Sequence, residues 1–344
     1  MLLATGSRPH IPRIAGVELG NVHSFHSMED AERIADAAQT VDSVVVLGAG
    51  FAGLEAAYAL ARRGKKVTVV EMMGQILPNQ LDWAGSQIIH QDLERAGVQI
   101  LLNTSVGAIN GETSVSSVTL TDNTNLLADL VVIATGIRAN KELAEQAGLA
   151  TNRGVVVNET MQTSNPDIYA AGDVIEIEDI STGRRVCSAT WFNAVVQGKY
   201  AAFNMTGRKR VYSEAVGIQN AVQFHHVPAI SFGQTLAGGE IDPDYETMAL
   251  QKDGVYKKLV LKDNVLRGMI FVGDIAKAGF YAALIRHRVD ISSHKTRLLD
   301  DDLSYASVMG QHSFGQKSPY TETAPEWGNA GFWAVRPSAV GIVR

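Results

Sequence analysis

Cysteine is nearly absent from this 344-residue chain, and its single thiol, Cys187, excludes an internal disulfide and is typical of a reducing compartment. No uninterrupted apolar run approaches the roughly 20 residues of a membrane span, and the amino terminus lacks the basic region and cleavage site of a signal peptide. An excess of basic charge is also lacking: 30 lysines and arginines stand against 36 acids, and the net charge of −6 argues against a general nucleic-acid surface. We therefore expect a cytoplasmic protein with no membrane span and no nucleic-acid partner.

The nine histidines have no spacing that is typical of a metal site, so we expect no metal. His225 and His226 are adjacent on an expected strand, where neighbouring side chains point to opposite faces and cannot share one ion. The remaining composition, with 46% hydrophobic and 19% charged residues, is that of an ordinary globular protein. The length allows two or three domains.

Residues 44–71 have the pattern of a strand, a glycine turn, a helix and a second strand that ends in an acid. The first strand is a continuous apolar run, which is typical of a parallel strand buried on both faces. We expect Gly48 to form the tight turn, Gly50 to let the backbone approach a pyrophosphate, and Gly53 to let the helix pack closely on the sheet. Glycines also serve ordinary turns, but the flanking strand and helix favour a dinucleotide site.

Glu71 ends the second strand of this unit, 23 residues after Gly48. A carboxylate in this position accepts hydrogen bonds from the ribose hydroxyls and repels a 2′-phosphate. Met72 and Met73, which follow it, offer no cation to a 2′-phosphate. The sequence therefore predicts NADH rather than NADPH as the ligand.

An apolar strand followed by Ala-Thr-Gly, one residue and Arg occurs twice, at 1–8 and at 131–138. The glycine of the second copy, Gly136, lies 88 residues after Gly48. If the first copy closes a similar unit, its glycine fingerprint precedes Gly6 by about 80 to 110 residues. We therefore expect the chain to begin inside a domain. A chance match of a short phrase is the alternative.

A third motif covers 163–174, where a turn around Pro166 leads into a short apolar strand that ends at Gly172 and Asp173. An acid at the carboxyl end of a strand in an open α/β sheet lies where ligands bind. The alternative interpretation is that Asp173 caps the next element.

In this order, the motifs resemble the flavoproteins with two dinucleotide-binding domains in the pyridine nucleotide-disulfide oxidoreductase superfamily, over about residues 1–300. The stretch 189–205 looks like the helix after the Gly-Asp motif in NADH:rubredoxin reductase and nitrite-reductase-like members. The resemblance implies an α/β fold of two Rossmann-like domains of the glutathione-reductase type, the first incomplete, and a small α+β C-terminal interface domain.

The resemblance also implies that FAD and NADH are the cofactors. In that family Asp173 would bind the ribityl or pyrophosphate region of FAD, Trp191 would lie at the flavin ring, and Glu55 would lie near the nicotinamide. As a bare sequence feature, Glu55 is an acid in the first turn of a helix, favoured by the helix dipole. The expected NAD set is Gly48, Gly50, Phe51, Ala52, Gly53, Glu55, Glu71, Thr135 and Gly136, and the expected FAD set is Ala4, Thr5, Gly6, Gly172, Asp173 and Trp191.

The expected domains are a partial FAD-binding domain (1–40), an NAD-binding domain (41–140), the second part of the FAD-binding domain (141–210), a C-terminal interface domain (211–303) and an irregular tail (304–344). Within them, Ser27 begins a polar helix, 256–272 form a hairpin that turns at 263–264, and an amphipathic helix covers 275–288. Large aromatics in the tail, Trp327, Phe332 and Trp333, belong either to a loosely ordered terminus or to a docking segment.

The implied function is a flavoprotein oxidoreductase that takes hydride from NADH and passes electrons from FAD to an acceptor, such as the small redox protein rubredoxin. The cofactors supply the chemistry, so no side chain is required as a general acid or base. A disulfide, peroxide or oxygen acceptor stays open, because the family's redox cysteines precede the matched segment; Cys187 is interpreted as a small buried or loop residue. The alternative function is an NADH-binding module or complex subunit that is inactive alone. A homodimer through the C-terminal domain is a further expectation.

Overall fold

The structure, a computed structural model, describes residues 1–213, 215–238, 242–300 and 302–309. The chain divides into two compact units, Met1–Leu299 and Asp300–Arg344. In the second unit the described part contains helix α7 (Tyr305–Met309). Most of the expected tail, including Trp327, Phe332 and Trp333, lies outside the described residues. Within those residues, no helix combines the length and the hydropathy that a membrane span requires.

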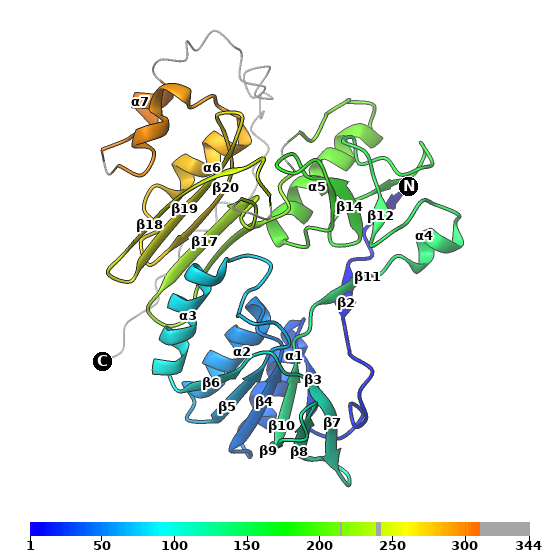
Figure 1. The fold of residues 1–344 in the computed structure, drawn as a ribbon. Helices are drawn as coiled ribbons and strands as arrows, with labels where there is room; N and C mark the ends of the chain where they lie inside the picture. Colours follow the sequence, from blue (N-terminus) through cyan, green and yellow to red (C-terminus); the bar gives the residue numbers. More distant parts are fainter. Residues whose placement is uncertain (214, 239–241, 301, 310–344) are drawn as a thin grey trace, which may run out of the picture. The chain divides into compact units, whose positions relative to one another are not determined.

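The first unit contains a five-stranded parallel sheet with the strand order β3-β10-β4-β5-β6 (Figure 1). Its strands are β3 (Val22–Ser24), β10 (Leu130–Ile133), β4 (Ser43–Leu47), β5 (Lys66–Val70) and β6 (Val98–Leu101). The predicted strand at 44–47 is β4, and its four residues are buried because both faces of the sheet are covered. The strand and helix on either side of the glycine fingerprint are therefore present.

Helices cover one face of this sheet, and a three-stranded antiparallel meander covers the other. The helices are α1 (Met28–Ala37), α2 (Phe51–Ala61) and α3 (Trp83–Arg95), and the meander is β7 (Val106–Gly111), β8 (Val115–Leu120) and β9 (Asn125–Leu127). Val44 and Val46 pack on the helical side, whereas Val45 and Leu47 pack against the meander. Helix α1 begins where predicted, because the Ser27 hydroxyl accepts from the Asp30 N–H and the Asp30 carboxylate accepts from the Ser27 N–H.

A short antiparallel ribbon joins this layer to a second group of elements (Figure 1). The ribbon is β2 (Ser7–Pro9) paired with β11 (Ile137–Ala139). The second group consists of β1 (Leu2–Leu3), β13 (Tyr169–Ala170), β12 (Val155–Val156), β14 (Ile175–Glu178), β15 (Arg185–Val186), α4 (Glu142–Gln146) and α5 (Trp191–Met205). β1 and β13 pair in parallel, so the first Ala-Thr-Gly phrase and the Gly-Asp motif follow neighbouring strands at the same edge.

The C-terminal part of the first unit is a five-stranded antiparallel sheet, ordered β16-β17-β20-β19-β18. Its elements are β16 (Gln219–Gln223), β17 (Pro228–Gly233), β18 (Glu246–Lys252), β19 (Val255–Lys262), β20 (Val265–Val272), helix α6 (Ala278–Arg286) and the 3-10 helix η2 (Ser292–Arg297). The predicted hairpin is β19–β20, and both turn residues, Asp263 and Asn264, have positive φ angles (53° and 58°), as a two-residue turn requires. The helix begins later than predicted, because the Asp274 carboxylate accepts from the Ala276 N–H in a turn and Lys277 is left-handed.

The sequence prediction for His225 and His226 is wrong. Both lie in the turn between β16 and β17 rather than on a strand, and their rings lie against each other with centroids 3.7 Å apart. Asp92 of α3 explains this placement, since its buried carboxylate accepts from the N–H groups of His226 and Val227 and lies 3.1 Å from His225 Nδ1. The hydrogen bonds between this turn and Asp92 therefore connect the antiparallel sheet to α3.

Candidate nucleotide-binding site

The three glycines of the fingerprint meet three different physical demands. Gly48 has φ +100°, and a Cβ there would stand 2.6 Å from the Ala134 carbonyl oxygen. A Cβ on Gly53 would stand 2.0 Å from the Gly48 carbonyl oxygen, so α2 could not approach the turn. A Cβ on Gly50 would meet nothing within 4 Å. Gly48 and Gly53 are therefore needed by the fold, whereas Gly50 leaves open space beside the N-terminus of α2, where N–H groups favour an anion.

Glu71 is buried and is fixed by the backbone on both sides. Its Oε2 accepts from the Ala49 N–H at 2.8 Å, and its Oε1 accepts from the Met73 N–H at 2.8 Å. A carboxylate has about four acceptor positions, so each oxygen keeps one for a ligand. No sequence motif indicates the hydrogen bond from Ala49, which connects the acid directly to the glycine turn.

A cavity of about 750 Å³ opens beside the glycine turn, and we call it the glycine-turn cavity. This volume is within the range of small-molecule and cofactor sites. The expected NAD residues that line it are Gly48, Gly50, Phe51, Ala52, Glu71, Thr135 and Gly136. Gly53 and Glu55 do not line it: Gly53 is buried under the turn, and Glu55 lies on α2, where partial burial raises the pKa of its carboxyl.

Several further residues that no sequence motif indicated line the same cavity, namely His10, Phe25, His26, Pro78, Asn79 and Gln80. Four lining segments begin at or just after the carboxyl ends of parallel strands β3, β4, β5 and β10. Ligands bind at this edge in open α/β sheets. β3 is short and carries no glycine signal, so local sequence patterns do not indicate Phe25 and His26. The order of the strands in the sheet would have indicated them. Neither lysine nor arginine lines the cavity, and its titratable residues are His10, His26 and Glu71.

The expected FAD residues meet at the paired ends of β1 and β13. Asp173 accepts a hydrogen bond from the Ser7 hydroxyl at 2.8 Å, although Ser7 follows the first Ala-Thr-Gly phrase in a distant part of the sequence. Gly172 has φ +86°, and its N–H donates to Gln197 Oε1 of α5 at 2.9 Å. The element after Asp173 is strand β14, so the alternative that Asp173 caps a helix is wrong.

Trp191 is the first residue of α5, and its side chain is 87% exposed. Thr190 caps this helix by accepting from the Asn193 N–H. The first turns of α5 lie beside the Gly-Asp motif, since a Cβ on Gly172 would meet the Ala194 Cβ at 3.7 Å. Trp191 is thus placed near the other expected FAD residues but does not line the glycine-turn cavity.

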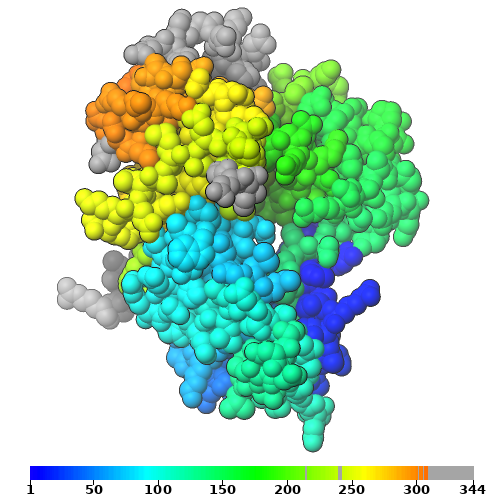
Figure 2. All heavy atoms as spheres, viewed as in Figure 1, coloured from blue at the N-terminus to red at the C-terminus, as the bar shows by residue number. Residues whose placement is uncertain are grey.

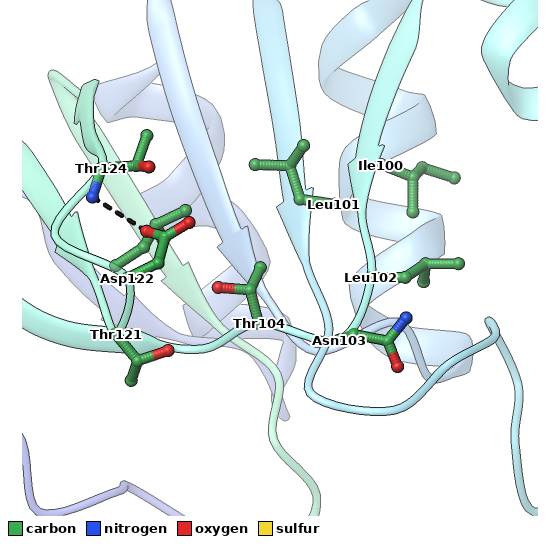
Figure 3. A pocket seen from close by; sticks show the side chains of 9 residues that line it. Ile100, Leu101, Leu102, Asn103, Thr104, Thr121, Asp122 and Thr124 are labelled. Carbon is green, nitrogen blue, oxygen red and sulfur yellow. Dashed lines mark hydrogen bonds between the residues drawn. The ribbon is translucent and has the colours of Figure 1, made fainter.

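A second cavity, of about 500 Å³, lies between the end of β6 and the turn that joins β8 to β9 (Figure 3). Leu101 and Thr104 line it from one segment, and Asp122 lines it from the other, where its carboxylate accepts from the Thr124 N–H at 2.8 Å. None of the expected NAD or FAD residues lines this cavity. The glycine-turn cavity is therefore the candidate nucleotide site.

The parallel sheet, the glycine turn and the buried acid define a dinucleotide-binding α/β protein. The chain belongs to the pyridine nucleotide-disulphide oxidoreductase family, whose model matches residues 1–198. The family and the α/β fold class predicted from the sequence are confirmed.

Relatives of known name include the assimilatory nitrate reductase electron transfer subunit of Bacillus subtilis (strain 168), which is 33% identical over 340 residues, 95% of this chain and 42% of the relative. The NADH-dependent phenylglyoxylate dehydrogenase subunit epsilon of Aromatoleum evansii is 31% identical over 317 residues, 90% of this chain and 74% of the relative. Among solved structures, the NAD-dependent persulfide reductase from A. fulgidus matches with a TM-score of 0.80 and 30% identity, over 89% of this chain and 59% of that one.

The chain spans less than half the length of some of these curated relatives, 42% of the nitrate reductase subunit and 35% of the nitrite reductase [NAD(P)H] of Bacillus subtilis (strain 168). A solved structure described as a FAD-dependent pyridine nucleotide-disulphide oxidoreductase, from Desulfovibrio vulgaris, covers 86% of this chain and matches with a TM-score of 0.76 and 28% identity.

Proposed function

We propose that the glycine-turn cavity binds NADH and that the chain is the NADH-oxidising part of a FAD-dependent oxidoreductase. The observation that carries the proposal is Glu71, a buried carboxylate that lines the cavity and is bonded to the Ala49 N–H of the glycine turn. Glu71 therefore connects the position expected for the ribose with the glycine turn expected to hold the pyrophosphate. Met72, 71% exposed beside it, leaves a 2′-phosphate without a cation.

The residues of this chain would bind and orient the nucleotide. The open backbone at Gly50 and the N-terminus of α2 would receive the pyrophosphate, and the free lone pairs of Glu71 would accept the ribose hydroxyls. Asp173, with Thr5 and Gly6 on the neighbouring segment, would hold FAD, and the N-terminus of α5 would favour negative charge on the flavin. When bound, FAD supplies the redox chemistry, so we assign no catalytic acid or base to this chain.

For the acceptor, we propose a small redox protein, with rubredoxin as the first candidate. Support comes from the relative described as an electron transfer subunit, which matches 95% of this chain. The homodimer expected through the C-terminal domain stays a prediction. The expected domain boundaries also stay predictions.

A second candidate is an NADH-binding module or complex subunit without activity of its own. The observation that favours it is the β1–β13 pair, which carries the expected FAD residues and includes only two strands within the described residues. Parallel sheets are usually larger and are covered on both faces. Under this proposal a further polypeptide segment completes the flavin site.

Titration calorimetry with NADH and NADPH, combined with an absorbance spectrum of the purified chain, separates these functions. A visible flavin band that bleaches with NADH but not with NADPH supports the oxidoreductase. NADH binding to a colourless protein favours the module. A chain that does not bind NADH contradicts both.

A further inference from the structure

The wall of the glycine-turn cavity is connected by hydrogen bonds to the antiparallel sheet through Asp82. Pro78, Asn79 and Gln80 form part of this wall, and Asp82 follows them as the N-cap of α3, accepting from the Gly85 N–H at 3.2 Å. The other carboxylate oxygen of Asp82 faces the sheet. The segment is therefore bonded at its end to an element outside the parallel sheet.

Two buried side chains of β19 hold that oxygen. The Tyr256 hydroxyl donates to Asp82 Oδ2 at 2.6 Å, and Lys258 Nζ lies 3.3 Å from the same atom. Lys258 also donates to the Thr235 carbonyl oxygen at 3.1 Å, so its ammonium is paired although the residue is buried. Burial and the adjacent Asp82 carboxylate raise the pKa of Tyr256, which therefore stays a hydrogen-bond donor at ordinary pH. We call Tyr256, Lys258 and Asp82 the β19 clamp.

The segment from the clamp to the glycine turn is held along its length. The Ser86 hydroxyl donates to the Ile76 carbonyl at 2.9 Å, and the Leu77 N–H donates to the Ala49 carbonyl at 2.9 Å. Leu77 is fully buried and has φ +49°, a conformation that a leucine keeps only where its surroundings impose it. These hydrogen bonds therefore connect β19, through Asp82 and the 76–77 segment, to Ala49, whose N–H is bonded to Glu71.

Apolar packing supports the same contact. Tyr256, Ile270 and Val272 of the sheet belong to one core cluster with Ile89 and Leu93 of α3. In Figure 2 the cyan atoms of the α3 segment lie directly against the yellow atoms of the sheet. This packing alone would join the two layers, so the partly buried ion pair at Asp82 is not required for their adhesion.

We propose that the β19 clamp positions the Pro78–Gln80 wall for NADH, so that Tyr256 and Lys258 are positioning residues for nucleotide binding although neither lines the cavity. This inference rests on the proposed NADH site. A buried charged group is costly unless it is paired, and removing one partner leaves the other uncompensated. Loss of the clamp should therefore loosen Asp82, the wall and the backbone at Leu77 together.

The test is the NADH dissociation constant of the full chain, measured by calorimetry well below the unfolding temperature. We expect Tyr256→Phe/Lys258→Met to raise it about tenfold or more, which corresponds to about 1.4 kcal/mol. Tyr256→Phe alone, which keeps the ring packing and removes only the hydroxyl, should give a smaller increase. Lys258→Arg, which keeps the charge, should bind NADH more tightly than Lys258→Met. Lys262→Met is the matched control, because Lys262 lies on the same strand but pairs with the exposed Asp244.

Hydrogen exchange provides the second measurement, since it does not depend on a ligand. Amides in 74–82 should exchange faster in the double variant than in the wild type, while those of β4 should not change. A folded double variant with a lower unfolding temperature but an unchanged dissociation constant would show that the clamp only stabilises the fold. If the wild type binds no NADH, the proposed function fails, and this inference fails with it.

Discussion

Thr5 and Thr135 make equivalent hydrogen bonds across the β2–β11 ribbon, each donating from its own Ala-Thr-Gly phrase to the segment that follows the other. The Thr5 hydroxyl donates to the Asn140 carbonyl at 2.6 Å, and the Thr135 hydroxyl donates to the His10 carbonyl at 2.6 Å. Each acceptor lies two residues beyond the arginine of the other copy, and the arginines themselves are paired. The duplicated phrase therefore pairs with itself about a local two-fold relation.

This symmetry allows a controlled comparison of two equivalent threonines. Thr135 lines the glycine-turn cavity and Thr5 does not. Thr5→Val and Thr135→Val should each lower the free energy of unfolding by about 1 kcal/mol, because each removes one hydrogen bond. Only Thr135→Val should weaken NADH binding in calorimetry. Equal loss of affinity in both variants would contradict the assignment of the nucleotide to this cavity.

Substitutions at two of the fingerprint glycines, Gly50 and Gly53, should affect NADH binding and folding stability differently. Gly50→Val adds a side chain in open space, so the free energy of unfolding should change by no more than about 1 kcal/mol, as expected at an N-cap, while NADH binding is lost. Gly53→Ala should instead destabilise the protein, because its Cβ would lie 2.0 Å from the Gly48 carbonyl oxygen. Thermal unfolding and calorimetry on both proteins measure the difference. Strong NADH binding by Gly50→Val would show that no phosphate approaches there.

Nucleotide preference should depend on Glu71 and Met72. Glu71→Gln/Met72→Arg removes the charge that repels a 2′-phosphate and adds a cation at an exposed position, so preference should move toward NADPH by about tenfold or more, given the 1.5 to 3 kcal/mol of a charged hydrogen bond. Glutamine keeps one acceptor for the Ala49 or Met73 N–H. Met205→Arg, at the end of α5, is the charge control. Unchanged preference would show that the acid does not contact the ribose.

Acid should weaken the contact between α3 and the histidine turn. Burial opposes ionisation of Asp92, but hydrogen bonds from the His226 and Val227 N–H groups and from His225 hold the pKa of Asp92 below its ordinary value. Because the folded-state pKa is lowered, this stabilisation is complete above the unfolded carboxyl pKa of about 3.9 and is lost as the pH falls through the folded value. Asp92→Asn should therefore destabilise the protein at pH 7 by about 1 to 3 kcal/mol.

The measurement is the free energy of unfolding in urea for the wild type and Asp92→Asn between pH 7 and pH 3. The difference should shrink as the pH falls below about 3.9, the carboxyl pKa of the unfolded chain, because the unfolded state then binds a proton that folded Asp92 resists. Glu32→Gln, at an exposed acid of helix α1, should show little change across this range. A difference that is constant with pH would contradict the role of the Asp92 charge.

Cys187 should react slowly with thiol reagents in the folded protein. Burial and the neighbouring Glu176 carboxylate raise the pKa of the Cys187 thiol, so little thiolate is present at pH 7. The rate with an aromatic disulfide reagent should rise with pH and should increase on unfolding in urea, which serves as the control because the chain has one cysteine. Cys187→Ala should keep NADH binding. Fast labelling of the folded protein at pH 7 would contradict this interpretation.

Local patterns in the chain were sufficient to predict the glycine turn, Glu71, the capping box at Ser27 and the β19–β20 hairpin. Each depends on residues close in sequence, where backbone conformation, helix capping and burial period act directly. The same reasoning failed for His225 and His226, because the Asp92 carboxylate that orders their turn comes from a distant helix.

Contacts between distant segments had to be seen in the folded chain. The bond from Ser7 to Asp173, the pairing of Thr5 with the second Ala-Thr-Gly copy, and the clamp at Asp82 join residues more than 130 positions apart. No local pattern encodes such pairs, because strand order and layer packing bring them together. The residue types suited to hold a dinucleotide could thus be read from the sequence alone, whereas the arrangement of the cavity wall and its link to β19 depend on tertiary packing.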